Sequence, residues 1–441
     1  MSYFANFDKA YFLLVIPILR MTWPVLQYRV RSIIVVPFAL AWFFFEYGRG
    51  MRSLVYIRQL KSYHYGMVFS IMLYLLLPVF YGLHSAGDRL SFRLYSAVAQ
   101  IMEFLLLTIA VQHSLVVGKI KELKFLFYVL CGAFLWLGVA AVRGGAKVAE
   151  MGGARLITSI NQVNRSKSIE YDYQIQDALS AGMGTAPSMY ISAFTVPLFI
   201  LSSFFMQRPW QKIACWVMAY MGWLNMKYGG LNTPLMITVI GLGLMLMALW
   251  FHMKKSLVVM GIFLAIWMTA FSFNPKIMSF MAPPLRAVAT LAENLPQIKM
   301  RCISMAEAVE GDMDTYAAVR YTLQQKSVRD FLNGTIIIGA LGEGRQYIGG
   351  GHSELLDCLA RYGLLGASVI FMFWYFYLKY CNELARVSLG KKWLVMPYIY
   401  AGAWIFSSIP NPALLGAPIM MLFIPGLALF YKDFNERWGI K

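Results

Sequence analysis

The chain has 441 residues, 59% of them hydrophobic, and a formal net charge of +18. Apolar runs of roughly 20 residues recur along the chain, and a helix of that length crosses a bilayer. These runs exclude an ordinary soluble enzyme of two or three domains. The basic residues lie in short clusters between these runs, a pattern of membrane topology, so the charge does not predict a nucleic-acid partner.

We therefore expect an all-α, polytopic integral membrane protein with about twelve transmembrane helices. The first candidate span contains Arg20 between Pro17 and Pro24, so a helix lying at the membrane interface is an equal alternative there. In chain order, the candidate spans are residues 10–26, 32–47, 65–83, 94–112, 125–142, 188–206, 211–226, 231–250, 256–273, 361–380, 394–410 and 412–431.

The distribution of charge predicts which side of the membrane each connection faces. Short connections between spans are rich in Lys and Arg, whereas two long polar stretches, residues 143–187 and 274–360, are close to charge balance. By the positive-inside rule, the short connections and both termini face the cytoplasm, and the two long loops face the opposite side. We expect a single membrane domain over residues 1–441 with two large outer loops.

The two outer loops differ in content. Loop 143–187 is rich in glycine, amide and arginine residues, whereas loop 274–360 contains three stretches whose pattern predicts helices. These stretches are residues 284–294, 299–309 and 314–332. Five scattered cysteines without paired spacing predict neither a disulfide framework nor a metal site.

The second outer loop ends in a segment with the features of an anion site. Three glycines at residues 349–351 allow a sharp backbone turn, and His352 follows them directly. Ser353 is a suitable N-cap for a helix with Glu354 and Asp357 in its first turn. The amides and the positive dipole end of that helix would lie beside the imidazole. This histidine is therefore the leading functional candidate, and the other histidines are expected to be structural.

Arginines of the two outer loops are candidates for binding phosphate. The planar guanidinium binds phosphate through two hydrogen bonds and keeps its charge, and nearby cations keep a histidine neutral and able to accept a proton. A loop arginine is more often simply solvated, so only a few are singled out. Arg320 ranks first because it lies on a helix-like segment flanked by tyrosines such as Tyr321; Arg155, Arg165 and Arg301 rank next.

His352-Ser353, followed by nine residues and then by Gly-Leu-Leu-Gly at residues 363–366, resembles a known motif. This motif, His-[Asn/Ser/Gln]-x9-Gly-x-x-[Gly/Thr/Tyr], belongs to the O-antigen polymerase and O-antigen ligase superfamily. The number of spans and the larger second outer loop are also similar to that family. Downstream of Arg320, the stretch Asp-Phe-Leu-Asn-Gly at residues 330–334 resembles the family's Phe-Leu-Asn-Pro, with glycine in place of proline.

The resemblance implies a GT-C-like, metal-independent and inverting glycosyltransferase of the bacterial inner membrane, without a cofactor and with its active site facing the periplasm. Its donor would be an undecaprenyl-diphosphate-linked oligosaccharide, with membrane lipid and a chain-length regulator protein as further partners. By likeness, His352 assists the acceptor hydroxyl, while Arg320 and the other loop arginines hold the diphosphate. Ser353, Glu354 and Tyr321 are the remaining substrate-binding candidates.

Three activities stay open. A polymerase joins one lipid-linked oligosaccharide to another, and it is favoured because the Gly-Gly-His-Ser-Glu-Leu-Leu-Asp form of the motif is more similar to polymerases of repeat-unit polysaccharides. A ligase would transfer the glycan to the lipid A core. A transporter of the same lipid-linked glycans is less favoured, since neither repeated halves nor discontinuous spans are evident in the sequence.

Overall fold

The structure, a computed structural model, describes residues 7–22, 32–48, parts of 62–76 and 109–119, 120–150, 186–229 except 207, 232–251, 279–293, 296–340 except 311 and 313–315, and 353–388. Each element in this part of the chain is a helix, as expected for an all-α protein. In order they are η2 (Lys9–Leu14), α1 (Val15–Thr22), α3 (Ser32–Glu46), α7 (Ile120–Glu150), α10 (Ala186–Phe205), α11 (Pro209–Gly229), α12 (Asn232–Phe251), α14 (Ala282–Leu291), α15 (Pro296–Glu310), α16 (Tyr316–Leu332) and α17 (Glu354–Ser388).

Most described helices coincide with predicted elements. α3, α10, α11 and α12 match the second, sixth, seventh and eighth candidate spans within a few residues. The three helices predicted in the second outer loop are confirmed as α14, α15 and α16. The candidate spans 256–273, 394–410 and 412–431, with most of 65–83 and 94–112, lie outside the described residues, so the number of spans stays a prediction.

α7 extends beyond the fifth candidate span, as a helix that runs to Glu150 and so into the first residues of the predicted outer loop 143–187. Gly144 and Gly145 therefore lie inside the helix rather than ending it. A glycine within a helix costs only about 1 kcal/mol, which a long helix tolerates.

Two described helices are long and apolar enough to cross a membrane, by length and composition: Ile120–Gly144 of α7 and Leu355–Glu383 of α17. The described part of the first candidate span is helical, with η2 and α1 covering residues 9–22, and its residues 23–26 lie outside the described part of the chain. Tyr11 and Leu14 of this segment are fully buried, so its described part packs against the bundle.

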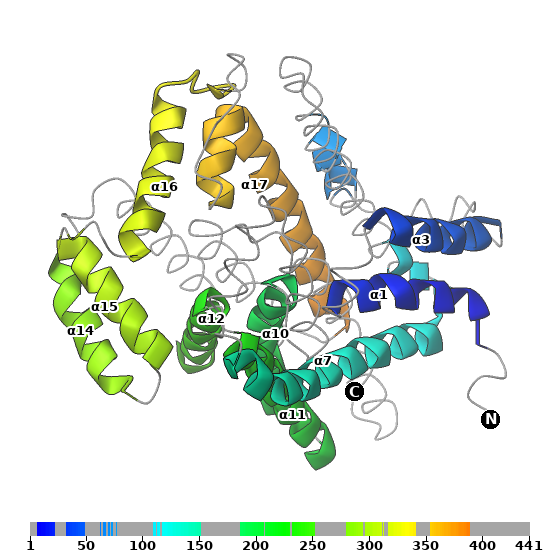
Figure 1. Ribbon diagram of the computed structural model, residues 1–441. Helices are drawn as coiled ribbons and strands as arrows, with labels where there is room; N and C mark the ends of the chain where they lie inside the picture. The colour runs from blue at the N-terminus through cyan, green and yellow to red at the C-terminus, as the bar shows by residue number, and fades with distance from the viewer. Residues whose placement is uncertain are drawn as a thin grey trace.

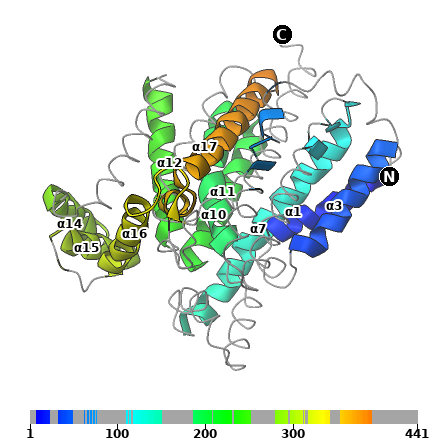
Figure 2. The ribbon, with the colours of Figure 1, turned by 90° about the horizontal axis from the view of Figure 1, so that it is seen from above.

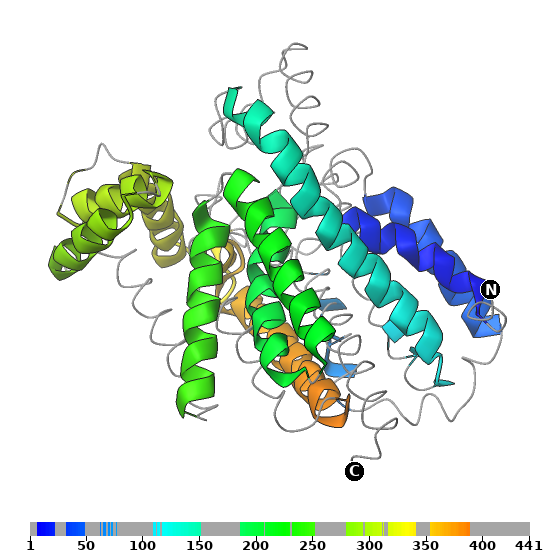
Figure 3. The ribbon, with the colours of Figure 1, turned by 90° about the horizontal axis from the view of Figure 1, so that it is seen from below.

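α7, α10, α11 and α12 form the centre of the molecule, with η2, α1 and α3 on one flank (Figures 1 and 3). Glycines lie where α11 crosses its two neighbours. A Cβ added at Gly138 of α7 would lie 2.8 Å from the Cα of Met221 on α11. One added at Gly222 of α11 would lie 2.7 Å from Cγ2 of Val196 on α10. Such small residues let helices approach closely, as is common between membrane helices.

The two faces of α11 differ in character. On the inner face, Nδ2 of the buried Asn225 donates a hydrogen bond to Oγ of Ser192 on α10 at 3.0 Å. The opposite face exposes large apolar side chains, namely Trp210, Ile213, Trp216, Val217 and Tyr220. An exposed apolar stripe of this length is typical of a surface that meets lipid or another protein.

α14 and α15 pack against each other at the edge of the molecule farthest from η2 and α3 (Figures 1 and 2). Arg286 of α14 and Glu310 of α15 connect them, with Nε–Oε1 and Nη2–Oε2 distances of 3.3 and 2.6 Å. Hydrogen bonding to Glu310 raises the pKa of Arg286. This loop arginine therefore already has a carboxylate partner on the neighbouring helix.

Candidate functional site

The structure describes the predicted site residues unequally. Ser353 is described in full. Four more have their backbones on described helices: Arg301 on α15, Arg320 and Tyr321 on α16, and Glu354 on α17. His352, Arg155 and Arg165 lie outside the described residues.

Ser353 caps the N-terminus of α17, as the sequence predicts. Its Oγ accepts a hydrogen bond from the backbone N–H of Leu356 at 3.0 Å. Its carbonyl oxygen accepts the first intrahelical hydrogen bond, from the N–H of Asp357 at 3.0 Å. The first backbone N–H groups of a helix have no carbonyl partner within the helix, and the Ser353 side chain accepts from one of them. The residue that follows His352 in the sequence is thus held in a defined helix start.

Asp357 links this helix start to α16. Its Oδ2 accepts a hydrogen bond from the backbone N–H of Ser353 at 3.1 Å. Its Oδ1 accepts one from the hydroxyl of Ser327 on α16 at 2.5 Å. All three residues are buried, with exposed fractions of 7% for Asp357, 2% for Ser353 and 1% for Ser327. We call these three residues the Asp357 clasp, because one carboxylate fastens two separate helices.

Gly363 interrupts α17, with a φ of 64° and a ψ of −158°. Non-glycine residues essentially never adopt this backbone conformation. It divides α17 into a first limb of residues 354–362 and a second limb of residues 364–388, and Figure 1 shows the first limb beside α16. The sequence does not predict this break, because the apolar pattern continues through it.

The loop after α16 binds to the break in α17 through the backbone. The N–H groups of Leu364 and Leu365 donate hydrogen bonds to the carbonyl oxygens of Ile336 and Ile337, at 2.9 and 3.0 Å. The start of the second limb therefore finds its acceptors in a different segment of the chain. The Gly-Leu-Leu-Gly half of the motif is thus a structural junction, which fixes the end of α16 against α17.

α16 and the first limb of α17 run in the same direction, since residues later in the α16 segment contact residues later in α17. Ser327 bonds to Asp357, Phe331 packs against the buried pair Ala340 and Ala360, and Ile336 bonds to Leu364. Arg320 precedes Ser327 by seven residues, which is two helical turns, so it lies on the same face of α16. The backbone of Arg320 is therefore about 10 Å from that of Ser327 along the axis of α16, in the direction of its N-terminus and beyond the Ser353 end of α17.

A second polar cluster lies on the other flank of the molecule. Nζ of Lys119 is 2.5 Å from Oδ2 of Asp8 and 2.7 Å from Oε2 of Glu46. Nε2 of His113 is 2.9 Å from the same Glu46 oxygen, and the backbone N–H of Asp8 donates to Oε1 of Glu122 at 2.9 Å. These five residues, the N-terminal ion cluster, connect η2, α3 and the start of α7.

The sequence does not predict this cluster. His113 is among the histidines expected to be structural, and Lys119 and Glu122 lie in one of the short connections rich in Lys and Arg. In the structure His113 and Glu122 are buried, with exposed fractions of 3% and 5%. One signal was available: Glu46 is the only charged residue of the apolar helix α3, and a lone charge in such a helix usually has a partner inside the protein.

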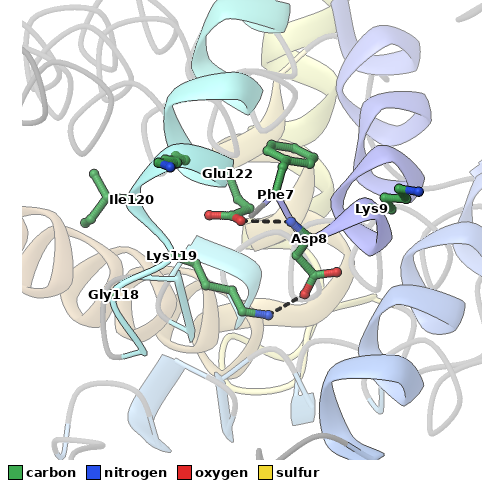
Figure 4. A pocket seen from close by; sticks show the side chains of 8 residues that line it. Phe7, Asp8, Lys9, Gly118, Lys119, Ile120 and Glu122 are labelled. Carbon is green, nitrogen blue, oxygen red and sulfur yellow. Dashed lines mark hydrogen bonds and ion pairs between the residues drawn. The ribbon is translucent and has the colours of Figure 1, made fainter. Parts of the chain in front are cut away.

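A cavity of about 800 Å³ adjoins the N-terminal ion cluster (Figure 4). Lys9, Lys119 and Lys121 line it together with Asp8 and Glu122. Both of these carboxylates accept hydrogen bonds from within the protein. Asp8 accepts from the N–H of Ala10 and from Nζ of Lys119, and Glu122 accepts from the N–H of Asp8. We therefore assign the cluster a structural role.

We expect the substitution Lys119→Met to lower the free energy of unfolding by about 3 kcal/mol, because it removes the cation that faces two carboxylates of low exposure. Lys119, Asp8 and Glu46 have side-chain exposed fractions of 20%, 12% and 2%. The measurement is denaturation of the purified protein in detergent. Lys9→Met is the control, since Lys9 is exposed beside the same cavity, and its effect should stay within about 0.5 kcal/mol. Equal effects of the two substitutions would contradict the assigned role.

Among the described residues, no group of three or more His, Cys, Asp or Glu side chains is arranged to hold a metal ion. The five cysteines are free thiols. No protein-family model, curated protein or solved structure matches the chain. The chemistry of the candidate site therefore has to be inferred from its own residues.

Proposed function

We propose that the protein is a membrane glycosyltransferase that polymerises lipid-linked repeat units of a polysaccharide. The observation that carries the proposal is the start of α17. Ser353 caps this helix directly after the motif histidine, and the Asp357 clasp fastens it to α16, the helix that carries Arg320. Two residue types needed for glycosyl transfer from a diphosphate, a base and a fixed cation, thus belong to two segments that are fastened together.

The reaction is a displacement at the anomeric carbon of the donor sugar. The acceptor hydroxyl oxygen forms the new bond to that carbon, and its proton passes to the imidazole of His352. The bond between the sugar and the diphosphate breaks, and undecaprenyl diphosphate leaves with the electron pair. Arg320 would stabilise the charge that builds on the departing oxygen, an interaction strongest in the transition state. Arg155, Arg165 and Arg301 would supply further charge for the diphosphate, and Ser353, Glu354 and Tyr321 would contact the sugars.

A membrane setting suits this reaction, because the donor carries a polyprenyl chain. The apolar part of the second limb of α17, residues 364–383, would extend for about 30 Å, which is the thickness of the hydrocarbon core. The first limb and α14 to α16 would then lie outside the bilayer. Together with the positive-inside pattern, this supports an inner-membrane protein with about twelve spans, cytoplasmic termini and a periplasmic site.

Two other activities use the same substrates. An O-antigen ligase would transfer the glycan to the lipid A core with similar residues, and a transporter would move the lipid-linked glycan without bond cleavage. The polymerase is favoured by the form of the motif around His352. No described feature favours transport.

The decisive test supplies the purified protein in detergent with lipid-linked repeat units, isolated from cells that lack it, and with a metal chelator. A polymerase yields a ladder of longer lipid-linked glycans and releases undecaprenyl diphosphate. A product that forms only when lipid A core is added identifies a ligase. Unchanged repeat units, from protein that remains folded, would refute a transferase and leave the transporter.

A further inference from the structure

We propose that Asp357 and Ser327 are positioning residues for the transfer reaction, acting through His352 and Arg320. The inference rests on the proposed function. The observation behind it is that a single buried carboxylate binds two groups that belong to different helices, Ser327 Oγ at 2.5 Å and Ser353 N at 3.1 Å.

The first of the two bonds acts on the backbone that carries His352. The N–H of Ser353 belongs to the peptide bond that joins His352 to Ser353, so Oδ2 of Asp357 restrains the residue to which the histidine is attached. The bond is the reciprocal half of the cap, in which Ser353 Oγ accepts from Leu356 and the buried Ser353 N–H donates to Asp357. Asp357 therefore restrains the helix start one covalent step from the proposed base.

The second bond acts on the helix that carries Arg320. Ser327 lies two helical turns after Arg320 on the same face of α16, so the bond from its hydroxyl to Asp357 limits sliding of α16 along α17. A slide would change the distance between the cation that holds the diphosphate and the base that deprotonates the acceptor. Asp357 thus sets both positions from one carboxylate.

The clasp buries a carboxylate, which is unfavourable unless its oxygens are hydrogen-bonded, and both oxygens of Asp357 accept a hydrogen bond here. The two helices also meet where Phe331 packs against the buried pair Ala340 and Ala360, and through the backbone bonds at Leu364. Packing and the backbone junction hold the helices together, and the carboxylate adds a fixed register at the end where the chemistry takes place.

The test measures kcat and KM for chain elongation with Asp357→Leu and with Ser327→Ala. Asp357→Leu keeps roughly the shape of the side chain and removes both acceptors, whereas asparagine could keep both bonds because the Ser327 hydroxyl can also accept. We expect kcat to fall about 10- to 100-fold, because a displacement of about 1 Å in a reacting group can cost that much, with KM changed less than twofold. The double substitution should cost no more than the larger single one, since both remove the same clasp.

Matched variants separate positioning from folding. Ser327→Thr keeps a hydroxyl and should retain most of kcat. Ser368→Ala removes a serine whose hydroxyl bonds within α17, to the carbonyl of Leu365 at 2.7 Å, and should leave kcat unchanged. Melting temperatures of all variants are measured in detergent alongside the rates, and rates are expressed per folded molecule.

The outcomes distinguish this inference from the proposed function. If His352→Ala is inactive while Asp357→Leu and Ser327→Ala keep the wild-type kcat, the positioning role is refuted and the function stands. If His352→Ala is fully active, the proposed function itself fails. If the two clasp variants lose activity only in proportion to a loss of folded protein, the residues only stabilise the fold. If their effects multiply in the double variant, the two residues do not act as one unit. Either result overturns the inference.

Discussion

Replacing His352 with alanine is expected to lower the rate of glycan elongation by about 10²- to 10⁴-fold, the range that a general acid or base usually contributes. In the proposed mechanism the imidazole accepts the proton of the acceptor hydroxyl as this oxygen attacks the sugar. Proton transfer is made only in the transition state, so the loss should appear in kcat and leave KM nearly unchanged. The measurement is the rate with purified protein, together with the ladder of glycan lengths in complemented cells at matched membrane abundance.

Two further variants make this result interpretable. Arg286→Ala changes an arginine of the same loop that is already bound to Glu310, so elongation should continue at the wild-type rate. His352→Gln can form a hydrogen bond but cannot accept the proton, and it should be as inactive as the alanine variant. A full ladder with His352→Ala would rule out the catalytic role. A single repeat left on the lipid A core would mean that ligation survives and polymerisation is lost, whereas complete loss of capped core would indicate a ligase.

Local sequence patterns were sufficient where a helix depends on its own residues. The helices of the second outer loop and the cap at Ser353 follow from apolar periodicity and from a hydroxyl directly before a helical run. The extension of α7 to Glu150 shows the limit of that reasoning, because the apolar pattern ends near residue 142 while the helix continues through Gly144 and Gly145. Inside a long packed helix, neighbouring turns hold such residues in the helical conformation.

Features that depend on distant partners could not be predicted in this way. The break at Gly363 depends on carbonyl groups of Ile336 and Ile337, which lie in another segment. The N-terminal ion cluster joins Lys119 to Asp8, 111 residues away, and to Glu46, 73 residues away. Nothing in the sequence near Lys119 indicates these partners. The clasp between Ser327 and Asp357 is of the same kind, because either residue alone would be interpreted as an ordinary polar position on a helix.

Gly363→Ala is expected to destabilise the folded protein by about 3 kcal/mol or more, from two causes that add. The conformation at Gly363 costs any other residue about 1–3 kcal/mol, and forcing extra volume into a packed site costs a similar amount. The added Cβ would lie 2.5 Å from the carbonyl oxygen of Ile337 and 2.6 Å from the amide nitrogen of Gly339. Both atoms are backbone, so no side-chain rotation can relieve the overlap. The measurement is the melting temperature in detergent and the abundance of the variant in membranes.

Gly132→Ala is the matched control, because Gly132 lies inside α7 and an added Cβ would meet nothing within 4 Å. Alanine favours a helix over glycine by about 1 kcal/mol, so this variant should melt at or above the wild-type temperature. If Gly363→Ala behaved in the same way, the close approach between the loop after α16 and the break in α17 would not exist as described. The expected contrast between two glycines within helices has a specific cause. Gly132 lies in an ordinary turn of α7, whereas Gly363 lies at the junction that holds the segment after α16 against α17. Strain at Gly363 should therefore weaken the fold and also displace the proposed site at the start of α17.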